Sequence, residues 1–103
     1  MIDVSPNHLD IVLCILAKYV PECETRVFGS RFTGTAKLYS DLDIALVGHE
    51  KLDWRLMADI KEEFQESELP FRVDILDWNA ISAEFRKVIE ESGYKVIVQR
   101  TFI

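Results

Sequence analysis

The sequence has few of the features that mark secreted or membrane-spanning proteins. It contains two cysteines, Cys14 and Cys23, and Cys14 lies in an apolar run, so we expect two reduced structural thiols rather than a disulfide framework. It has no apolar run of about 18 residues, the length that spans a membrane. The first ten residues lack the basic and apolar regions of a signal peptide. These absences predict a cytoplasmic protein without a membrane partner.

Basic residues are also scarce. The chain has 12 Lys and Arg against 18 Asp and Glu, and its formal net charge is −6. An extended DNA- or RNA-binding surface needs clustered Lys and Arg, so this charge balance excludes one. A local phosphate site remains compatible with the charge, and cations are favoured.

What the sequence does contain is an alternation of helical and strand-like segments. Its 103 residues are the usual size of one domain, which we predict over residues 1–103. Ser5 as N-cap and Pro6 at the first helical position predict a helix that runs to about Tyr19. The other expected elements are a strand over 24–29, one or two helical turns over 30–35, a strand over 41–48, a helix over 51–67, a strand over 71–78, a helix over 79–92 that is capped internally at Ser82, and a short strand over 94–99. This order predicts an α/β (α+β) fold with a small mixed sheet of about four strands backed by helices.

Two aspartates begin the second predicted strand. Asp41 and Asp43 are two positions apart, so their side chains project to one face while Leu42 projects to the other. Neighbouring carboxylates repel one another unless a cation or a proton intervenes. Mg²⁺ is commonly held by one or two carboxylates together with substrate phosphates. The pair is therefore a candidate Mg²⁺ site, although aspartates also begin strands for purely local reasons.

A third carboxylate, Asp74, lies within the apolar third strand. An ionised group is costly there unless it is paired or binds metal, and a salt bridge to Arg72 or to another cation is the structural alternative. Together with Asp41 and Asp43, Asp74 could help to hold two cations about 4 Å apart, as in two-metal phosphoryl-transfer sites. Asp77, which precedes a helix, is expected to form a cap or turn.

A Gly-Ser pair follows the first predicted strand. Gly29 allows a phosphate to approach the backbone, and N–H groups at a helix start attract anions. Ser30 adds a hydroxyl donor and Arg31 a positive charge, while Gly34 keeps the next turn tight. An ordinary strand-to-helix turn is the alternative for the pair taken alone. The combination with the acids favours a site for a nucleoside triphosphate and its metals.

These motifs resemble a known signature. Gly29-Ser30, ten intervening residues and then Asp41-Leu42-Asp43, with Asp74 on a later strand, are similar to the nucleotidyltransferase superfamily that includes DNA polymerase beta. The small size and the wording of these motifs resemble its minimal nucleotidyltransferases. Arg31, Gly34 and Ser40 fit the family pattern as well. Thr33 departs from it, because many minimal members have a second basic residue at that position.

The resemblance implies a nucleotidyltransferase fold and transfer of a nucleoside monophosphate, usually AMP from ATP, to a hydroxyl. Gly29 and Ser30 would hold the β- and γ-phosphates, with Arg31 and Ser40 as further phosphate-binding residues. The catalytic and metal-binding residues would be Asp41, Asp43 and Asp74, which would hold two Mg²⁺ ions, with Mn²⁺ as an alternative.

The resemblance also implies a partner. Minimal nucleotidyltransferases are commonly paired with a helical HEPN protein in toxin–antitoxin systems, and some adenylylate a tyrosine of that protein. The apolar segment 94–103 fits either a docking surface or a buried last strand. Two alternatives stay open: a non-catalytic nucleotide-binding subunit that silences its partner, and half of a two-chain antibiotic-modifying enzyme. The acidic stretch 61–68 is interpreted as the solvated face of a helix.

Overall fold

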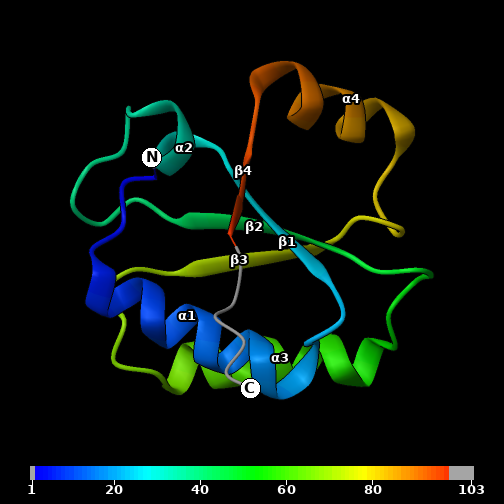
Figure 1. The fold of residues 1–103 in the computed structure, drawn as a ribbon, viewed down its shortest axis with the longest axis horizontal. Coiled ribbons are helices and arrows are strands. Elements are labelled where there is room, and N and C mark those ends of the chain that lie inside the picture. Colours follow the sequence, from blue (N-terminus) through cyan, green and yellow to red (C-terminus); the bar gives the residue numbers. More distant parts are fainter. Residues whose placement is uncertain (1, 98–103) are drawn as a thin grey trace, which may run out of the picture.

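The computed structural model describes residues 2–97 and shows a four-stranded sheet with helices on both faces (Figure 1). In chain order the elements are α1 (Pro6–Tyr19), β1 (Glu24–Phe28), α2 (Ser30–Thr33), β2 (Leu42–Val47), α3 (Trp54–Glu66), β3 (Val73–Asp77), α4 (Ala83–Ser92) and β4 (Lys95–Ile97). The predicted mixed α/β architecture is confirmed. The remainder of the last predicted strand and of the segment 94–103 lies outside the described residues.

Side-chain caps fix where the longer helices begin. Ser5 accepts a hydrogen bond from the His8 backbone N–H at 3.4 Å, and Ser82 accepts one from Phe85 at 3.1 Å, as both were predicted to do. α3 begins later than predicted because Asp53 caps it by accepting from the Arg55 N–H at 2.8 Å. None of the helices within residues 2–97 combines the length and the apolar character needed to cross a membrane.

The sheet has the strand order β3-β2-β1-β4. β1 runs antiparallel to both β2 and β4, whereas β2 and β3 are parallel. In this register Asp43 of β2 lies opposite Phe28 of β1 and opposite Asp74 of β3. Residues opposite one another in a sheet share a face, so the pairing brings two of the predicted acids together.

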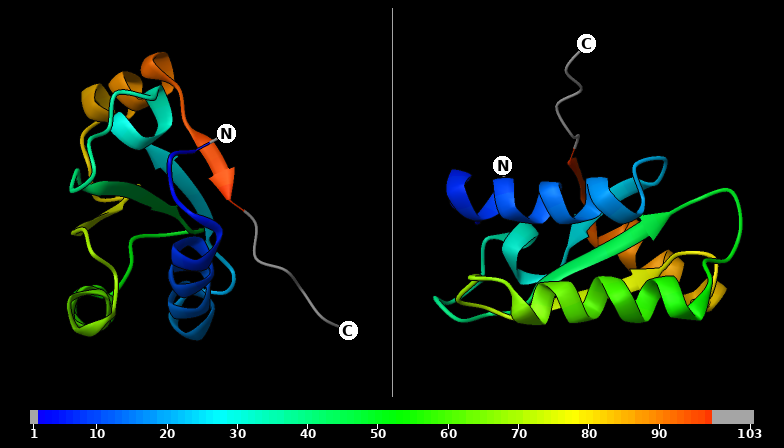
Figure 2. Two further views of the ribbon diagram at one scale, coloured as in Figure 1. Left: turned by 90° about the vertical axis from the view of Figure 1, so that its left-hand side faces the viewer. Right: turned by 90° about the horizontal axis from the view of Figure 1, so that it is seen from below.

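The core fills the space between the sheet and the helix pair α1 and α3, which cover one face (Figure 2). Leu42, Ile44 and Leu46 point into this core and are fully buried, which confirms the alternation predicted for this strand. Other fully buried side chains in this core include Val12 of α1, Val27 of β1 and Ile60 of α3. Because alternate β2 side chains point the opposite way, Asp43 faces away from this core.

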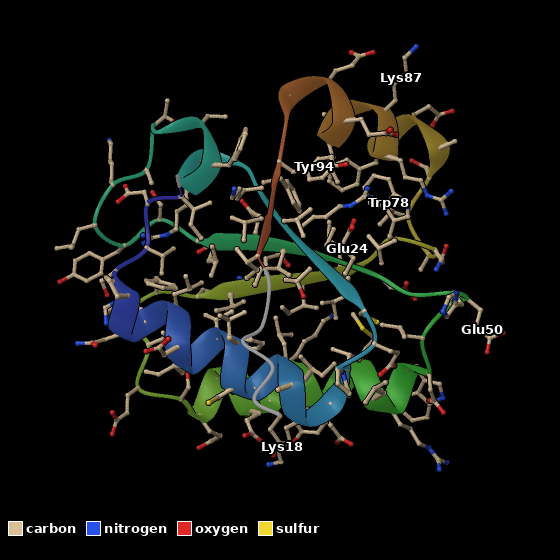
Figure 3. All side chains as sticks on the ribbon, viewed as in Figure 1. Lys18, Glu24, Glu50, Trp78, Lys87 and Tyr94 are labelled. Carbon is tan, nitrogen blue, oxygen red and sulfur yellow. The ribbon has the colours of Figure 1, made fainter. Side chains whose placement is uncertain are left out.

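The opposite face of the sheet has a smaller aromatic cover beneath α4 (Figure 3). The guanidinium carbon of Arg26 lies 4.7 Å from the Trp78 ring centroid and 4.5 Å from that of Tyr94. Phe28 meets Phe85 of α4 edge to face, with ring centroids 6.3 Å apart. The Phe28–Phe85 contact attaches α4 to β1, and the Arg26 contacts attach the segments on either side of α4.

Candidate active site

Two acids lie side by side on the central strands. Asp43 and Asp74 are register partners on parallel β2 and β3, and adjacent strands are about 4.8 Å apart. Both residues are half-buried, and Asp41 is exposed immediately before β2. Within residues 2–97 Asp74 forms no ion pair with Arg72 or with any other cation, so the salt-bridge alternative for this acid is not realised.

The electrostatics of Asp43 show that these acids influence one another. The pKa of Asp43 is raised to about 6, chiefly by burial and then by the nearby charges of Asp74 and Asp41. A carboxylate in this position is costly while nothing positive lies beside it. A cation placed next to Asp43 would remove that cost, because opposite charge favours the ionised form.

The three acids do not form a closed cage on their own. Within residues 2–97, no three His, Cys, Asp or Glu side chains converge closely enough to hold a metal ion as they stand. Repulsion between carboxylates explains why they stay apart. The donor chemistry nevertheless fits a hard divalent cation, which prefers carboxylate oxygens and takes its remaining ligands from water or phosphate. The metal-binding roles of Asp41, Asp43 and Asp74 stay a prediction.

The backbone at Gly29 is built around the Asp43 carboxylate. Gly29 precedes α2 with φ +74°, a region that favours glycine. A Cβ atom at this position would collide with Oδ2 of Asp43. Two requirements, a left-handed backbone and close approach to an acid, therefore call for glycine here. The first turn of α2, which begins at the half-buried Ser30, is thereby placed beside the acids.

Arg31 is buried beneath the loop that leads into β2. Its side chain is only 6% exposed, and its guanidinium donates to the backbone carbonyls of Asp3 at 2.8 Å, Leu38 at 3.1 Å and Ser40 at 2.8 and 3.0 Å. It also lies over the Phe71 ring, 4.1 Å from the centroid. These contacts position the loop, and the predicted contact of Arg31 with phosphate stays a prediction.

Ser40 closes a turn in that same loop. Its hydroxyl accepts a hydrogen bond from the Lys37 backbone N–H at 2.8 Å, and its carbonyl receives Arg31. The hydroxyl proton is still free to donate, so its phosphate contact stays a prediction. The same loop exposes Leu38 and Tyr39, which are 75% and 72% accessible and precede Asp41 in the chain. Sequence reasoning missed this apolar pair, since nothing in the local pattern distinguishes it from a connecting segment.

Two further residues that the sequence singled out, Thr33 and Asp77, make structural contacts. Thr33, the departure from the family pattern, is exposed, and its hydroxyl pairs with that of Thr35 at 3.0 Å. Asp77 is buried and accepts from the Leu52 N–H at 2.8 Å and the Asn79 N–H at 3.1 Å. The predicted turn role of Asp77 is confirmed.

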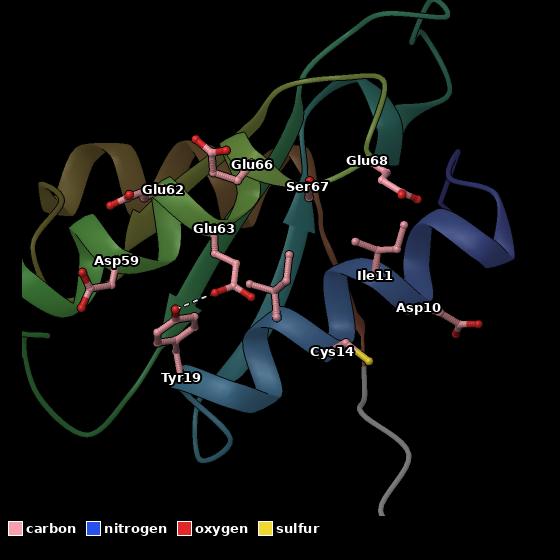
Figure 4. A pocket seen from close by; sticks show the side chains of 11 residues that line it. Asp10, Ile11, Cys14, Tyr19, Asp59, Glu62, Glu63, Glu66, Ser67 and Glu68 are labelled. Atoms are coloured by element: carbon pink, nitrogen blue, oxygen red, sulfur yellow. Dashed lines mark hydrogen bonds between the residues drawn. The ribbon is translucent and has the colours of Figure 1, made fainter.

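Two hollows differ in their relation to the acids. A cavity of about 560 Å³ lies between α3 and β3 and has Asp74 in its wall, together with the cations Lys61 and Arg72. A larger hollow of about 740 Å³ lies between α1 and α3 (Figure 4). Asp74 is the one predicted acid in the wall of the smaller cavity, and the wall of the larger hollow contains none of the three.

Comparison with known proteins supports the signature. The family model described as Polymerase beta, Nucleotidyltransferase matches residues 15–101. The probable protein adenylyltransferase MntA of Haemophilus influenzae is 44% identical over 99 residues, which cover 96% of this chain and 86% of that protein.

Solved structures agree in fold. A toxin–antitoxin crystal structure with AMP-PNP aligns with TM-score 0.70 and 24% identity, covering 84% of this chain and 69% of that one. A mutant MntA–HpeT toxin–antitoxin structure aligns with TM-score 0.70 and 22% identity, covering 89% and 72%. The polymerase-beta match spans most of the chain, the MntA relative spans nearly all of it, and the glycine and acids of the signature meet at one place in the fold. The chain therefore belongs to the polymerase-beta nucleotidyltransferase family.

Proposed function

We propose that this chain transfers AMP from ATP to a hydroxyl on a partner protein, in a reaction that depends on Mg²⁺. The observation that carries the proposal is the meeting of Gly29, Asp43 and Asp74, where the glycine backbone, held next to two acids, can receive a triphosphate. Carboxylates and phosphates are both negatively charged and repel each other. A triphosphate can therefore bind beside these acids only when cations lie between the phosphates and the carboxylates.

Each residue has a proposed part. Asp41 and Asp43 would hold the metal ions, and Asp74 would hold the one on the acceptor side. Gly29 and Ser30 would bind the β- and γ-phosphates through the backbone and the serine hydroxyl. When bound, Mg²⁺ supplies neutralising charge for the triphosphate and acidifies the acceptor hydroxyl.

The chemical step is an in-line exchange at the α-phosphorus. The acceptor oxygen forms a bond to that phosphorus as the bond to the β-phosphate oxygen breaks, and pyrophosphate leaves. The acceptor proton passes to a base at the site, for which Asp74 is the proposed group. The protein contributes position and fixed charge rather than a covalent intermediate.

The relatives support a protein acceptor. MntA is named as a probable protein adenylyltransferase, and the structural neighbours are toxin–antitoxin complexes, one of them with AMP-PNP. We therefore propose that a HEPN-family toxin is the partner and acceptor, and that this chain is its antitoxin. Use of ATP and the two free cysteines are in keeping with the cytoplasm as the place of action.

The direct test follows radioactivity from α-labelled ATP into protein. The purified chain is incubated with Mg²⁺ and the labelled ATP, with and without the product of the neighbouring gene as the candidate HEPN partner. The matched control is Asp41→Asn/Asp43→Asn. Label on the HEPN protein that disappears with the control is the expected result. Binding of ATP without any transfer would instead support the non-catalytic nucleotide-binding subunit.

A further inference from the structure

The hollow between α1 and α3 has an apolar floor. Its volume is about 740 Å³, and the α1 side chains Ile11, Cys14, Ile15 and Tyr19 line it (Figure 4). Ile15 is buried, Ile11 and Tyr19 are half-buried, and Cys14 is exposed. The floor therefore presents apolar side chains that solvent can reach in the free protein.

The rim of this groove is acidic. The carboxylates that line it are Asp10, Asp59, Glu62, Glu63, Glu66 and Glu68, and none of the lining residues is Lys, Arg or His. Glu63 is paired, since it accepts from Lys18 Nζ at 2.9 Å and from the Tyr19 hydroxyl at 2.7 Å. The other five rim residues are exposed and form no ion pair within residues 2–97. The acidic helix face that the sequence indicated is thus one wall of a groove.

We infer that this groove binds a basic amphipathic helix of a partner protein. An apolar floor selects an apolar face, and five unpaired carboxylates around it select Lys or Arg at the edges of that face. A third helix laid between α1 and α3 would follow α1, which is about 20 Å long. A second copy of this chain is a poor occupant, because its net charge is also −6.

The position of the groove separates docking from chemistry. α1 and α3 cover the face of the sheet opposite to the one that carries Asp43 and Asp74 (Figure 2). A partner held in the groove leaves the acids open to nucleotide. The chain is therefore built to hold a protein on one face while the other face remains free to act, and this inference does not depend on what the acids do.

The exposed thiol of Cys14 provides the readout. The full chain is mixed with a synthetic amphipathic helix of leucine and lysine, about four turns long, and the rate at which Cys14 is alkylated is followed by mass spectrometry. The half-buried Cys23, whose thiol pKa is raised by burial, serves as an internal reference. The same peptide with glutamate in place of lysine tests the requirement for positive charge.

The groove variant is Glu62→Lys/Glu66→Lys, and the matched control is Glu50→Lys/Glu90→Lys, which makes the same charge change at exposed positions away from the groove. Circular dichroism establishes that both variants are folded. We expect the lysine peptide to protect Cys14 in the unmodified protein and the control, and to bind the groove variant at least about tenfold more weakly. Protection must also decline as salt is raised.

Three results would overturn the inference. Equal loss of binding in both charge-reversed variants would show a general attraction to an acidic protein. Equal protection by the glutamate peptide would show that the acidic rim selects nothing. A homodimer in sedimentation that only Glu62→Lys/Glu66→Lys dissociates would assign the groove to a second copy of the chain.

Discussion

The two faces of the sheet use the same strands for opposite purposes. On β2, Ile44 and its apolar neighbours are sealed beneath α1 and α3, whereas Asp43 between them faces the side where the glycine turn and Asp74 lie. The first face gains free energy by excluding water from apolar side chains. On the second face carboxylates are half-buried, and this partial burial of charge costs free energy. The core is thus concentrated on one face and the proposed chemistry on the other, with side chains only one residue apart along the strand.

The largest effect is expected on the apolar face. Ile44→Ala removes a fully buried side chain from the centre of the core and should lower the free energy of unfolding by about 4 kcal/mol. Urea unfolding measures this change. Val88→Ala is the control, since Val88 is 54% exposed and its truncation should change stability by less than about 0.5 kcal/mol. Similar losses for the two variants would contradict the placement of the core.

A smaller loss of stability is expected from a substitution at Gly29, in the turn between β1 and α2. Gly29→Ala combines a left-handed φ with a collision against Asp43, and should cost about 3 kcal/mol. Gly34→Ala is the comparison, because Gly34 lies in the ordinary left-handed helical region at φ +85° and ψ 13° with nothing within 4 Å of an added Cβ, so only about 1 kcal/mol is expected. Gly29 has ψ −157°, which adds backbone strain of its own, so the collision is isolated by a second substitution rather than by this comparison. In thermal unfolding, adding Asp43→Ala to Gly29→Ala should recover the part of the loss that the collision causes, and failure to do so would place the carboxylate elsewhere.

The third-largest effect on stability is expected at the buried guanidinium of Arg31. Arg31→Lys keeps a positive charge but loses the planar group that reaches three carbonyls, and should cost about 2 kcal/mol. The effect should be local: hydrogen exchange of the backbone amides should become faster over residues 37–41 while the rates in the rest of the chain change less. If Arg31 instead acted on phosphate, the same variant would weaken ATP binding while leaving stability and exchange unchanged.

The smallest expected effect is an increase in the free energy of unfolding. In the metal-free protein, Asp43→Asn removes a carboxylate whose pKa is raised from 3.8 to about 6, and should stabilise the fold at pH 8 by about 1 kcal/mol after allowance for solvent screening. Because the folded state holds this proton more tightly than the unfolded chain, the stability of the unmodified protein should decline as the pH rises from about 4 to about 6. Denaturant titrations across this range measure both effects. A variant that is less stable at pH 8 would contradict the cause assigned to the shift.

The sequence predicted the parts that depend on local pattern. Alternation placed Leu42 and Ile44 on the core side, the caps at Ser5 and Ser82 were evident from residue type, and the spacing of the glycine and acids indicated the site. These features need only neighbouring residues to be specified.

What the sequence did not predict depends on residues far apart along the chain. Arg31 turns inward because Phe71 and the carbonyl of Asp3, both remote in sequence, meet it there. The groove was missed for the same reason, since Tyr19 and Glu63 become neighbours only when α1 packs on α3. A charged helix face looks the same in sequence whether it borders solvent alone or an apolar floor.

The most direct test of the reactive face is a titration of the Asp43 carboxyl carbon by NMR, first without metal and then with Mg²⁺ and a non-hydrolysable ATP analogue. Without metal, the pKa should be about 6. With Mg²⁺ and the analogue, cations beside the carboxylate should lower the pKa to below its ordinary value. A pKa that stays near 6 under saturating Mg²⁺ and analogue would show that Asp43 does not bind the cations, and would contradict the division between the two faces.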